Sequence, residues 1–228
     1  MRDDAKIEVV EADEGEVFDI ELEEDILKRN SKLAEENRRL LDEHGILAID
    51  VMGAIGSGKT ALIEALAERL KDRYKIAMIA GDVTTTIDSM RVKRHGVESI
   101  QVNTGKECHL DANLINKALK KLDLNSIDLL FIENVGNLIC PAEFDLGAHK
   151  RVVVVSVTEG EYMVIKHPYI FLASDVAVIN KIDLAEAMGV DPDKLRRDAE
   201  NLKPGIKVVK VSVKQGSGIE EVIRALEL

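Results

Sequence analysis

Two short segments of the chain contain residues of the types that bind phosphate and transition metals in proteins. Residues 53–60, GAIGSGKT, fit the spacing G-x-x-x-x-G-K-S/T. Residues 106–112, KECHLDA, place a cysteine beside a histidine in a chain that has only two cysteines. Backbone N–H groups of a glycine-rich loop can surround a phosphate, whereas thiolate and imidazole groups bind Zn²⁺ and Ni²⁺. The sequence therefore indicates a nucleotide site and raises the hypothesis of a metal site.

The glycine-rich segment is predicted to be a phosphate-binding loop because a strand-like run, 46–52, precedes it and a helical pattern, 61–74, follows it. We expect Lys59 to reach the β- and γ-phosphates as a catalytic residue, and Thr60 to offer its hydroxyl to Mg²⁺. The residues predicted to contact the nucleotide here are Gly53, Gly56, Ser57, Gly58, Lys59, Thr60 and Ala61.

A second nucleotide motif, NKID at residues 180–183, ends another strand-like run and indicates guanine as the base. Asp183 can accept two hydrogen bonds from guanine, and adenine would leave this carboxylate unpaired. We expect Asn180 to complete the recognition and the alkyl stem of Lys181 to lie over the ring. Ser212 and Lys214, in SVK after the last strand-like run, are predicted to join the base site.

Acidic residues at the ends of predicted strands are candidates for binding the metal and the attacking water. Asp82 and Glu133 each end a strand-like run, and either could bind Mg²⁺ directly or through water. Asp82 or Asp88 could orient the hydrolytic water, although Asp82 could instead cap a helix. Gly136 suits a backbone N–H turned toward the γ-phosphate.

Strand-like and helical patterns alternate after residue 45. Apolar runs that suit strands buried on both faces occur at 46–52, 75–81, 97–103, 128–134, 151–157, 175–180 and 206–213. Amphipathic helical patterns occur at 61–74, 110–122, 191–203 and 218–228. This alternation predicts an α/β fold, a three-layer P-loop NTPase with a mostly parallel sheet of about seven strands and binding loops at the strand ends.

The chain before residue 45 is predicted to be an acidic N-terminal segment followed by an added helix. Apolar residues recur at helical spacing over 21–44, and Gly45 stands where a left-handed residue would end a helix. The apolar repeat is too short for a coiled coil, so we expect the helix to pack on the main domain. The predicted division is residues 1–44 for this part and 45–228 for the GTPase domain.

Composition excludes several classes of function. A net charge of −11 disfavours non-specific binding of nucleic acid, because like charges repel. The sequence has no apolar run near the roughly 20 residues that a membrane-spanning helix needs. Two cysteines do not make a disulfide framework, so we expect reduced thiols in the cytoplasm.

Five segments then point to a known family: GAIGSGKT, GDVTTTID, KECHLDA, FIENVGNLICP and NKIDL occur in this order. They resemble the HypB proteins, GTPases of the SIMIBI class that insert nickel during maturation of nickel–iron hydrogenase. The resemblance spans about residues 30–228. It implies hydrolysis of GTP to GDP and phosphate, and a homodimer that forms on binding GTP and metal. It also implies that the partners are other maturation proteins and a hydrogenase precursor.

The resemblance also implies that Cys108, His109 and Cys140 bind Ni²⁺ or Zn²⁺. Three ligands do not complete a tetrahedral site, but two chains with bridging thiolates could together hold two ions. Residues 1–30 contain no cysteine or histidine, and the five histidines of the chain do not cluster. Nickel storage is therefore not expected.

Other functions stay open at this point. Related GTPases deliver nickel to urease through a Cys-Pro-His pair, and chaperones of cobalamin enzymes need no cysteine–histidine pair. A P-loop kinase for a small molecule fits the phosphate loop, although NKID argues against it. The metal could also be zinc with the purely structural role of holding a dimer together. Finally, the cysteines could bind no metal, because free cysteines are often simply buried in a core.

Overall fold

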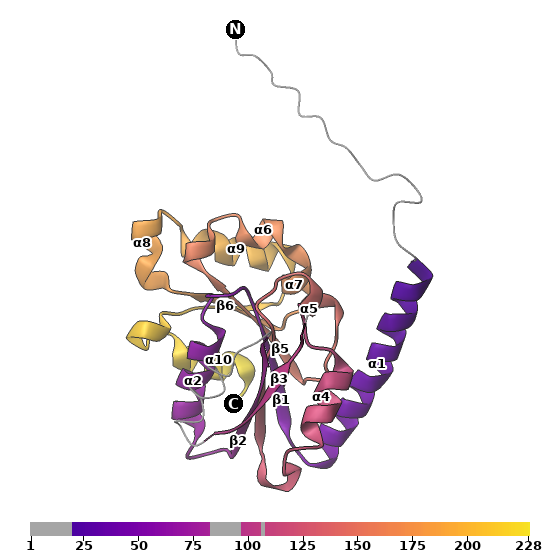
Figure 1. The fold of residues 1–228 in the computed structure, drawn as a ribbon. Helices are drawn as coiled ribbons and strands as arrows, with labels where there is room; N and C mark the ends of the chain where they lie inside the picture. The colour runs from indigo at the N-terminus through magenta and orange to yellow at the C-terminus, as the bar shows by residue number, and fades with distance from the viewer. Residues whose placement is uncertain (1–19, 83–96, 106–107) are drawn as a thin grey trace.

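A single seven-stranded sheet forms the centre of the protein (Figure 1). A computed structural model describes residues 20–82, 97–105 and 108–228. Its strands are β1 (Leu47–Met52), β2 (Ile76–Asp82), β3 (Glu98–Asn103), β4 (Leu129–Glu133), β5 (Lys150–Ser156), β6 (Val176–Asn180) and β7 (Lys207–Lys210). They lie in the order β3-β2-β4-β1-β5-β6-β7, and every pair is parallel. The predicted α/β fold and strand number are confirmed, and the sheet is entirely parallel rather than mostly so.

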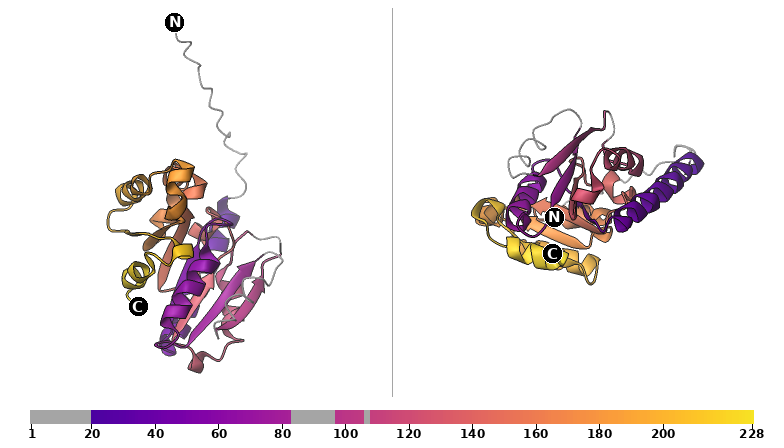
Figure 2. Two further views of the ribbon diagram at one scale, coloured as in Figure 1. Left: turned by 90° about the vertical axis from the view of Figure 1, so that its left-hand side faces the viewer. Right: turned by 90° about the horizontal axis from the view of Figure 1, so that it is seen from below.

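Helices cover both faces of the sheet, as strands that are apolar on both faces require. Helices α2 (Lys59–Leu70) and α10 (Ile219–Leu226) lie on one face (Figures 1 and 2). The opposite face carries α1 (Ile20–Glu43) and α4 (Ala112–Leu119) over one part of the sheet. The other part of that face carries α6 (Met163–Lys166), α7 (Pro168–Leu172) and α9 (Pro192–Leu202).

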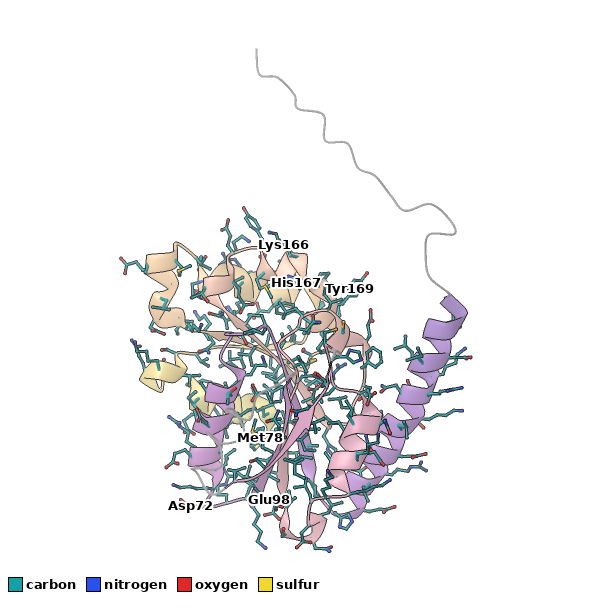
Figure 3. The ribbon with its side chains drawn as sticks, in the orientation of Figure 1. Asp72, Met78, Glu98, Lys166, His167 and Tyr169 are labelled. Atoms are coloured by element: carbon teal, nitrogen blue, oxygen red, sulfur yellow. The ribbon has the colours of Figure 1, made fainter. Side chains whose placement is uncertain are left out.

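Short elements connect these layers: α5 (Cys140–Glu143), α8 (Ala185–Met188), and the 3₁₀ turns η1 (Leu124–Ser126), η2 (Val157–Glu159), η3 (Ile182–Leu184) and η4 (Val213–Gln215). The strands all run toward one end of the molecule. Figure 3 shows Glu98, the first residue of β3, at the end opposite to Lys166, His167 and Tyr169. Loops that follow the strands therefore gather at the end where α6 and α7 lie. No helix in the described ranges is long and apolar enough to cross a membrane.

Helix α1 ends as the sequence predicts. Gly45 has a φ of +67°, and its N–H donates to the carbonyl of Asp42 at 3.0 Å. The N–H of Ile46 donates to the carbonyl of Leu41 at 2.9 Å. These two bonds form a Schellman motif, which stops the helix and leads directly into β1.

Buried asparagines attach α1 to α4 and confirm that α1 packs on the main domain. Asn37 donates from Nδ2 to the carbonyl oxygens of Ala112, at 2.8 Å, and Leu146, at 3.2 Å. Its Oδ1 accepts from Nδ2 of Asn116 at 2.9 Å. Asn30, seven residues or about two helical turns earlier, accepts from the N–H of Ala112 at 2.8 Å. Hence the amino end of α4 depends on side chains from α1. The domain division at residue 44 stays a prediction.

We expect Asn37→Ala to lower the free energy of unfolding by about 1–3 kcal/mol, because it leaves buried polar groups on α4 without a partner. The matched control is Ser31→Ala on the same helix, where the exposed hydroxyl bonds only to Leu27 of α1. That change should stay within about 0.5 kcal/mol. Urea denaturation measures both, and equal losses would contradict this account of how α1 docks.

A buried carboxylate interrupts the apolar strand β1. Asp50 is fully buried, and its Oδ2 lies 3.5 Å from Nε of Arg151 on the adjacent β5. Nδ2 of Asn134 donates to its Oδ1 at 3.2 Å. Burial raises the pKa of Asp50 to about 6, opposed mainly by the positive charge of Arg151 and the hydrogen bond from Asn134, while the charge of Asp145 adds to the rise.

This raised pKa predicts a pH dependence of stability. Asp50 holds its proton more tightly in the folded protein than in the unfolded chain. Its contribution to the free energy of unfolding is therefore full below about pH 4 and is lost as the pH rises through about 6. The difference in free energy of unfolding, wild type minus Asp50→Asn, should fall by roughly 3 kcal/mol across this window. Denaturant titrations at several pH values measure it, and a difference that does not change with pH would contradict the prediction.

Candidate functional site

The phosphate loop connects β1 to α2, and α2 begins at Lys59 as the motif requires. Nζ of Lys59 donates to the carbonyl oxygens of Gly53, at 3.0 Å, and Ala54, at 3.1 Å. Ser57 is fully buried, and Ala61 is half-buried in the first turn of α2. Gly56 and Gly58 both have positive φ values, 79° and 104°. The loop is therefore held in a compact, ordered turn at the amino end of a helix.

Thr60 and Glu133, two of the predicted Mg²⁺ ligands, are in direct contact. Oγ1 of Thr60 donates to Oε1 of Glu133 at 2.7 Å, and both side chains are buried. A hydroxyl and a carboxylate are ligands of the type that Mg²⁺ prefers, so the pair fits the ion. Because Glu133 is the last residue of β4, this contact joins the phosphate loop to the neighbouring strand.

The remaining acidic candidates are only partly covered by the structure. Asp82 is the last residue of β2, two positions beyond Ala80, which pairs with Glu133 in the sheet. Its backbone therefore ends close to the predicted Mg²⁺ site. Asp88 lies outside the described residues. The assignment of a water-orienting residue stays a prediction.

The NKID segment approaches the phosphate loop from β6. Nδ2 of Asn180 donates to the carbonyl of Ser57 at 2.9 Å, and its Oδ1 accepts from the N–H groups of Lys181 and Val213 at 2.7 and 3.3 Å. A Cβ at Gly58 would lie 2.2 Å from Nδ2 of Asn180, so only glycine fits there. Asn180 thus ties together the phosphate loop and two base-site segments, a role that the sequence did not suggest.

The predicted base-site residues lie side by side. Oγ of Ser212, fully buried, donates to Oδ1 of Asp183 at 2.6 Å, which fixes the orientation of that carboxylate. Lys181 has a φ of +60°, a left-handed conformation that is unusual for a residue with a side chain. Lys214 lies in η4 and is exposed. Asp183 is therefore pre-oriented as a hydrogen-bond acceptor.

Cys108, His109 and Cys140 come together as predicted, although Cys108 and Cys140 are 32 positions apart. Their ligand atoms all lie within 4.8 Å of one another. Sγ of Cys108 is 3.0 Å from Sγ of Cys140 and 3.9 Å from Nδ1 of His109. Partial burial raises the pKa of the Cys140 thiol, and the adjacent Cys108 raises it further. Two sulfurs and an imidazole this close together fit Zn²⁺ or Ni²⁺.

Side chains that the sequence did not single out support this cluster. Nδ2 of Asn137 donates to Sγ of Cys140 at 3.5 Å, and the ring of Phe144 packs against His109 with 3.9 Å between ring centres. The signal for Asn137 was present in the sequence, since it lies in the ENVGNLICP segment. No local pattern marks Phe144 as a neighbour of His109.

The segment from Glu133 to Cys140 runs past the phosphate loop on its way to the metal cluster. Asn137 forms a β-bridge with Gly53. A Cβ at Gly136 would lie 2.3 Å from the Ile55 side chain, so a larger residue would displace the loop. Gly136 therefore lies directly against the phosphate loop, consistent with its predicted position near the γ-phosphate.

Glu159 is a further acidic residue at the same edge that the sequence did not reveal. It follows β5 in a capping box with Ser156, whose N–H donates to its Oε1 at 2.9 Å. Burial raises the pKa of Glu159, opposed by the hydrogen bond from Ser156 and by the charges of Lys181 and Lys59. The residue thus shares the electrostatic environment of both nucleotide motifs.

Comparisons with known proteins agree with this geometry. The sequence pattern of the family described as "CobW/HypB/UreG, nucleotide-binding domain" matches residues 47–210. A relative from Methanocaldococcus jannaschii, named "Probable hydrogenase maturation factor HypB", is 55% identical over 91% of this chain and 94% of its own length.

Two solved structures are similar over most of their length. Hydrogenase maturation factor HypB from Archaeoglobus fulgidus is 51% identical, with a TM-score of 0.82 over 88% of this chain and 98% of that chain. HypB from Helicobacter pylori in complex with nickel is 34% identical, with a TM-score of 0.82 over 87% of this chain and 94% of that chain. Together with the phosphate loop, the NKID motif and the Cys/His cluster, these similarities show that this chain belongs to the HypB family.

Proposed function

We propose that this protein is a GTP-hydrolysing metallochaperone that delivers nickel during maturation of nickel–iron hydrogenase. The observation that carries the proposal is the continuous segment from Glu133 to Cys140. It begins at the Thr60 hydroxyl, bridges Gly53 of the phosphate loop and ends at a metal-ligand cluster. A nucleotide-dependent shift in this segment would therefore reach the metal ligands directly. The nickel complex of the H. pylori relative supports Ni²⁺ as the cargo.

The nucleotide in this proposal is GTP with Mg²⁺. Lys59 would bind the β- and γ-phosphates, Thr60 and Glu133 would hold Mg²⁺, and Asp183 would pair with guanine. Mg²⁺ would neutralise charge on the phosphates, while Asp82 or Asp88 would orient the attacking water. The pre-oriented Asp183 carboxylate, held by Ser212 at 2.6 Å, supports guanine over adenine.

The metal in this proposal is bound by Cys108, His109 and Cys140, and zinc is the alternative to nickel. Each chain supplies three ligands, one fewer than a tetrahedral site requires. Pairing of two chains on GTP binding would complete the coordination, and hydrolysis would then separate the ligand sets and release the ion. The partners would be other maturation proteins and the hydrogenase precursor.

The base assignment is tested by Asp183→Asn. We expect GTP binding to weaken by about 2–3 kcal/mol, because hydrogen bonds to a charged acceptor are lost. Binding of xanthosine triphosphate should strengthen, since the new amide can donate to the carbonyl that replaces the 2-amino group of guanine. Competition binding measures both nucleotides. Asp72→Asn, an exposed change at the far end of the molecule (Figure 3), is the control, and equal losses for both nucleotides would refute the assignment.

The metal assignment is tested by removing each ligand in turn. We expect Cys108→Ala, His109→Ala and Cys140→Ala each to weaken Ni²⁺ binding by more than the roughly 10–100-fold that loss of a supporting residue costs. The nickel–thiolate absorption band should also disappear in the cysteine variants. His44→Ala, a half-buried histidine beyond the end of α1, is the matched control and should bind Ni²⁺ like the wild type. Unchanged Ni²⁺ binding in all three variants would show that the three side chains only pack together and do not bind the ion.

A further inference from the structure

A chain of polar contacts inside the protein connects the two ligand segments of the metal cluster. Asp50 lies at its centre, on the face of β1 that also carries Ala48 and Met52. Those two neighbours belong to different hydrophobic clusters, so the carboxylate lies where the two clusters meet. Asp50 has no exposed surface, and Glu133 of β4 is buried as well.

On one side, the chain of contacts runs from Asp50 to the segment that carries Cys108 and His109. Asn134 donates from Nδ2 to Oδ1 of Asp50 at 3.2 Å. Oδ1 of Asn134 accepts from the backbone N–H of Leu110 at 3.2 Å, and Leu110 directly follows His109. Asn134 is buried, so this bond is shielded from water and fixes the backbone beside two metal ligands.

On the other side, the chain of contacts runs from Asp50 through Arg151 to α5. Nε of Arg151 lies 3.5 Å from Oδ2 of Asp50. The guanidinium donates from Nη2 to the carbonyl of Pro141 and from Nη1 to the carbonyl of Ala142, the latter at 3.4 Å. Pro141 directly follows Cys140. Arg151 therefore holds the single turn of α5 in place, and this turn begins with Cys140, the third proposed metal ligand.

We propose that Asp50 is a positioning residue. It holds the segment with Cys108 and His109 in place relative to the segment with Cys140, and it links both segments to the nucleotide site. The inference rests on the proposed function and deepens it by naming the route of the coupling. Asn134 directly follows Glu133, whose carboxylate contacts Thr60 of the phosphate loop. A movement of Glu133 would therefore shift Asn134, which contacts Leu110 directly and reaches Arg151 through Asp50.

The charge on Asp50 is required for this role. Arg151 can extend its guanidinium toward the Pro141 and Ala142 carbonyls because a carboxylate neutralises it at the sheet. With an amide in place of the carboxylate, an NH₂ donor or a neutral oxygen would face Nε. The attraction between the two opposite charges that holds Arg151 would then be lost. An apolar residue would fit the surroundings of β1 better, so stability alone does not account for an ion pair here.

The experiment measures Ni²⁺ affinity of the full chain with GDP and with a non-hydrolysable GTP analogue, by equilibrium dialysis. Four proteins are compared: wild type, Asp50→Asn, Arg151→Lys and Asp42→Asn. Lysine keeps the charge opposite Asp50 but cannot span both carbonyls with a planar fork. Asp42 is the matched control, because its carboxylate pairs with His149 at 2.9 Å and contacts neither ligand segment. Thermal unfolding and nucleotide affinity are measured on the same samples.

We expect Asp50→Asn and Arg151→Lys to bind Ni²⁺ roughly tenfold more weakly, as loss of a supporting residue usually does. The ratio of Ni²⁺ affinities in the two nucleotides should move toward one, while nucleotide affinity and the control stay at wild-type values. Arg151→Lys keeps the test valid if Asp50→Asn does not fold. A wild-type ratio of Ni²⁺ affinities in every variant that folds would overturn this inference and leave the proposed function intact. Wild-type protein that binds no Ni²⁺ at all would overturn the proposed function as well.

Discussion

The hydrogen bond between Thr60 and Glu133 is the contact on which the arrangement of the site depends. At 2.7 Å, it joins the first turn of α2 to the last residue of β4. The segment that follows Glu133 consequently starts beside the phosphate loop, bridges to Gly53 through Asn137, and ends at Cys140, a predicted metal ligand. A single short segment is therefore in contact with the predicted Mg²⁺ site at one end and the thiol cluster at the other.

An all-parallel sheet makes this contact possible, because the carboxyl ends of all strands meet at one edge. β4 lies beside β1 in the sheet, so Glu133 and the phosphate loop must be neighbours. The same rule brings the end of β6 close enough for Asn180 to donate to the carbonyl of Ser57. Loop segments far apart in the sequence are thus combined into one site.

Local patterns in the sequence were sufficient to predict the helices and strands and to bring together most of the candidate site residues. Each predicted strand was found, the Schellman end at Gly45 was correct, and Cys108, His109 and Cys140 meet as the family resemblance implied. The contact of Asp50 with Arg151 could not be predicted, because it depends on the register between β1 and β5, which pairs residues 101 positions apart. For the same reason, the hydrogen bonds of Asn180 with Ser57 and Val213 could not be predicted, and its expected contact with the base stays a prediction.

The most direct test of the central claim is the affinity of the wild-type protein for a non-hydrolysable GTP analogue, with and without saturating Ni²⁺. If one segment links both sites, each ligand must change the affinity for the other by the same factor. The account predicts tighter binding of the analogue when Ni²⁺ is bound, and no such change in Cys140→Ala. Equal affinity of the wild type with and without Ni²⁺ would show that the two sites, although joined by one segment, act independently.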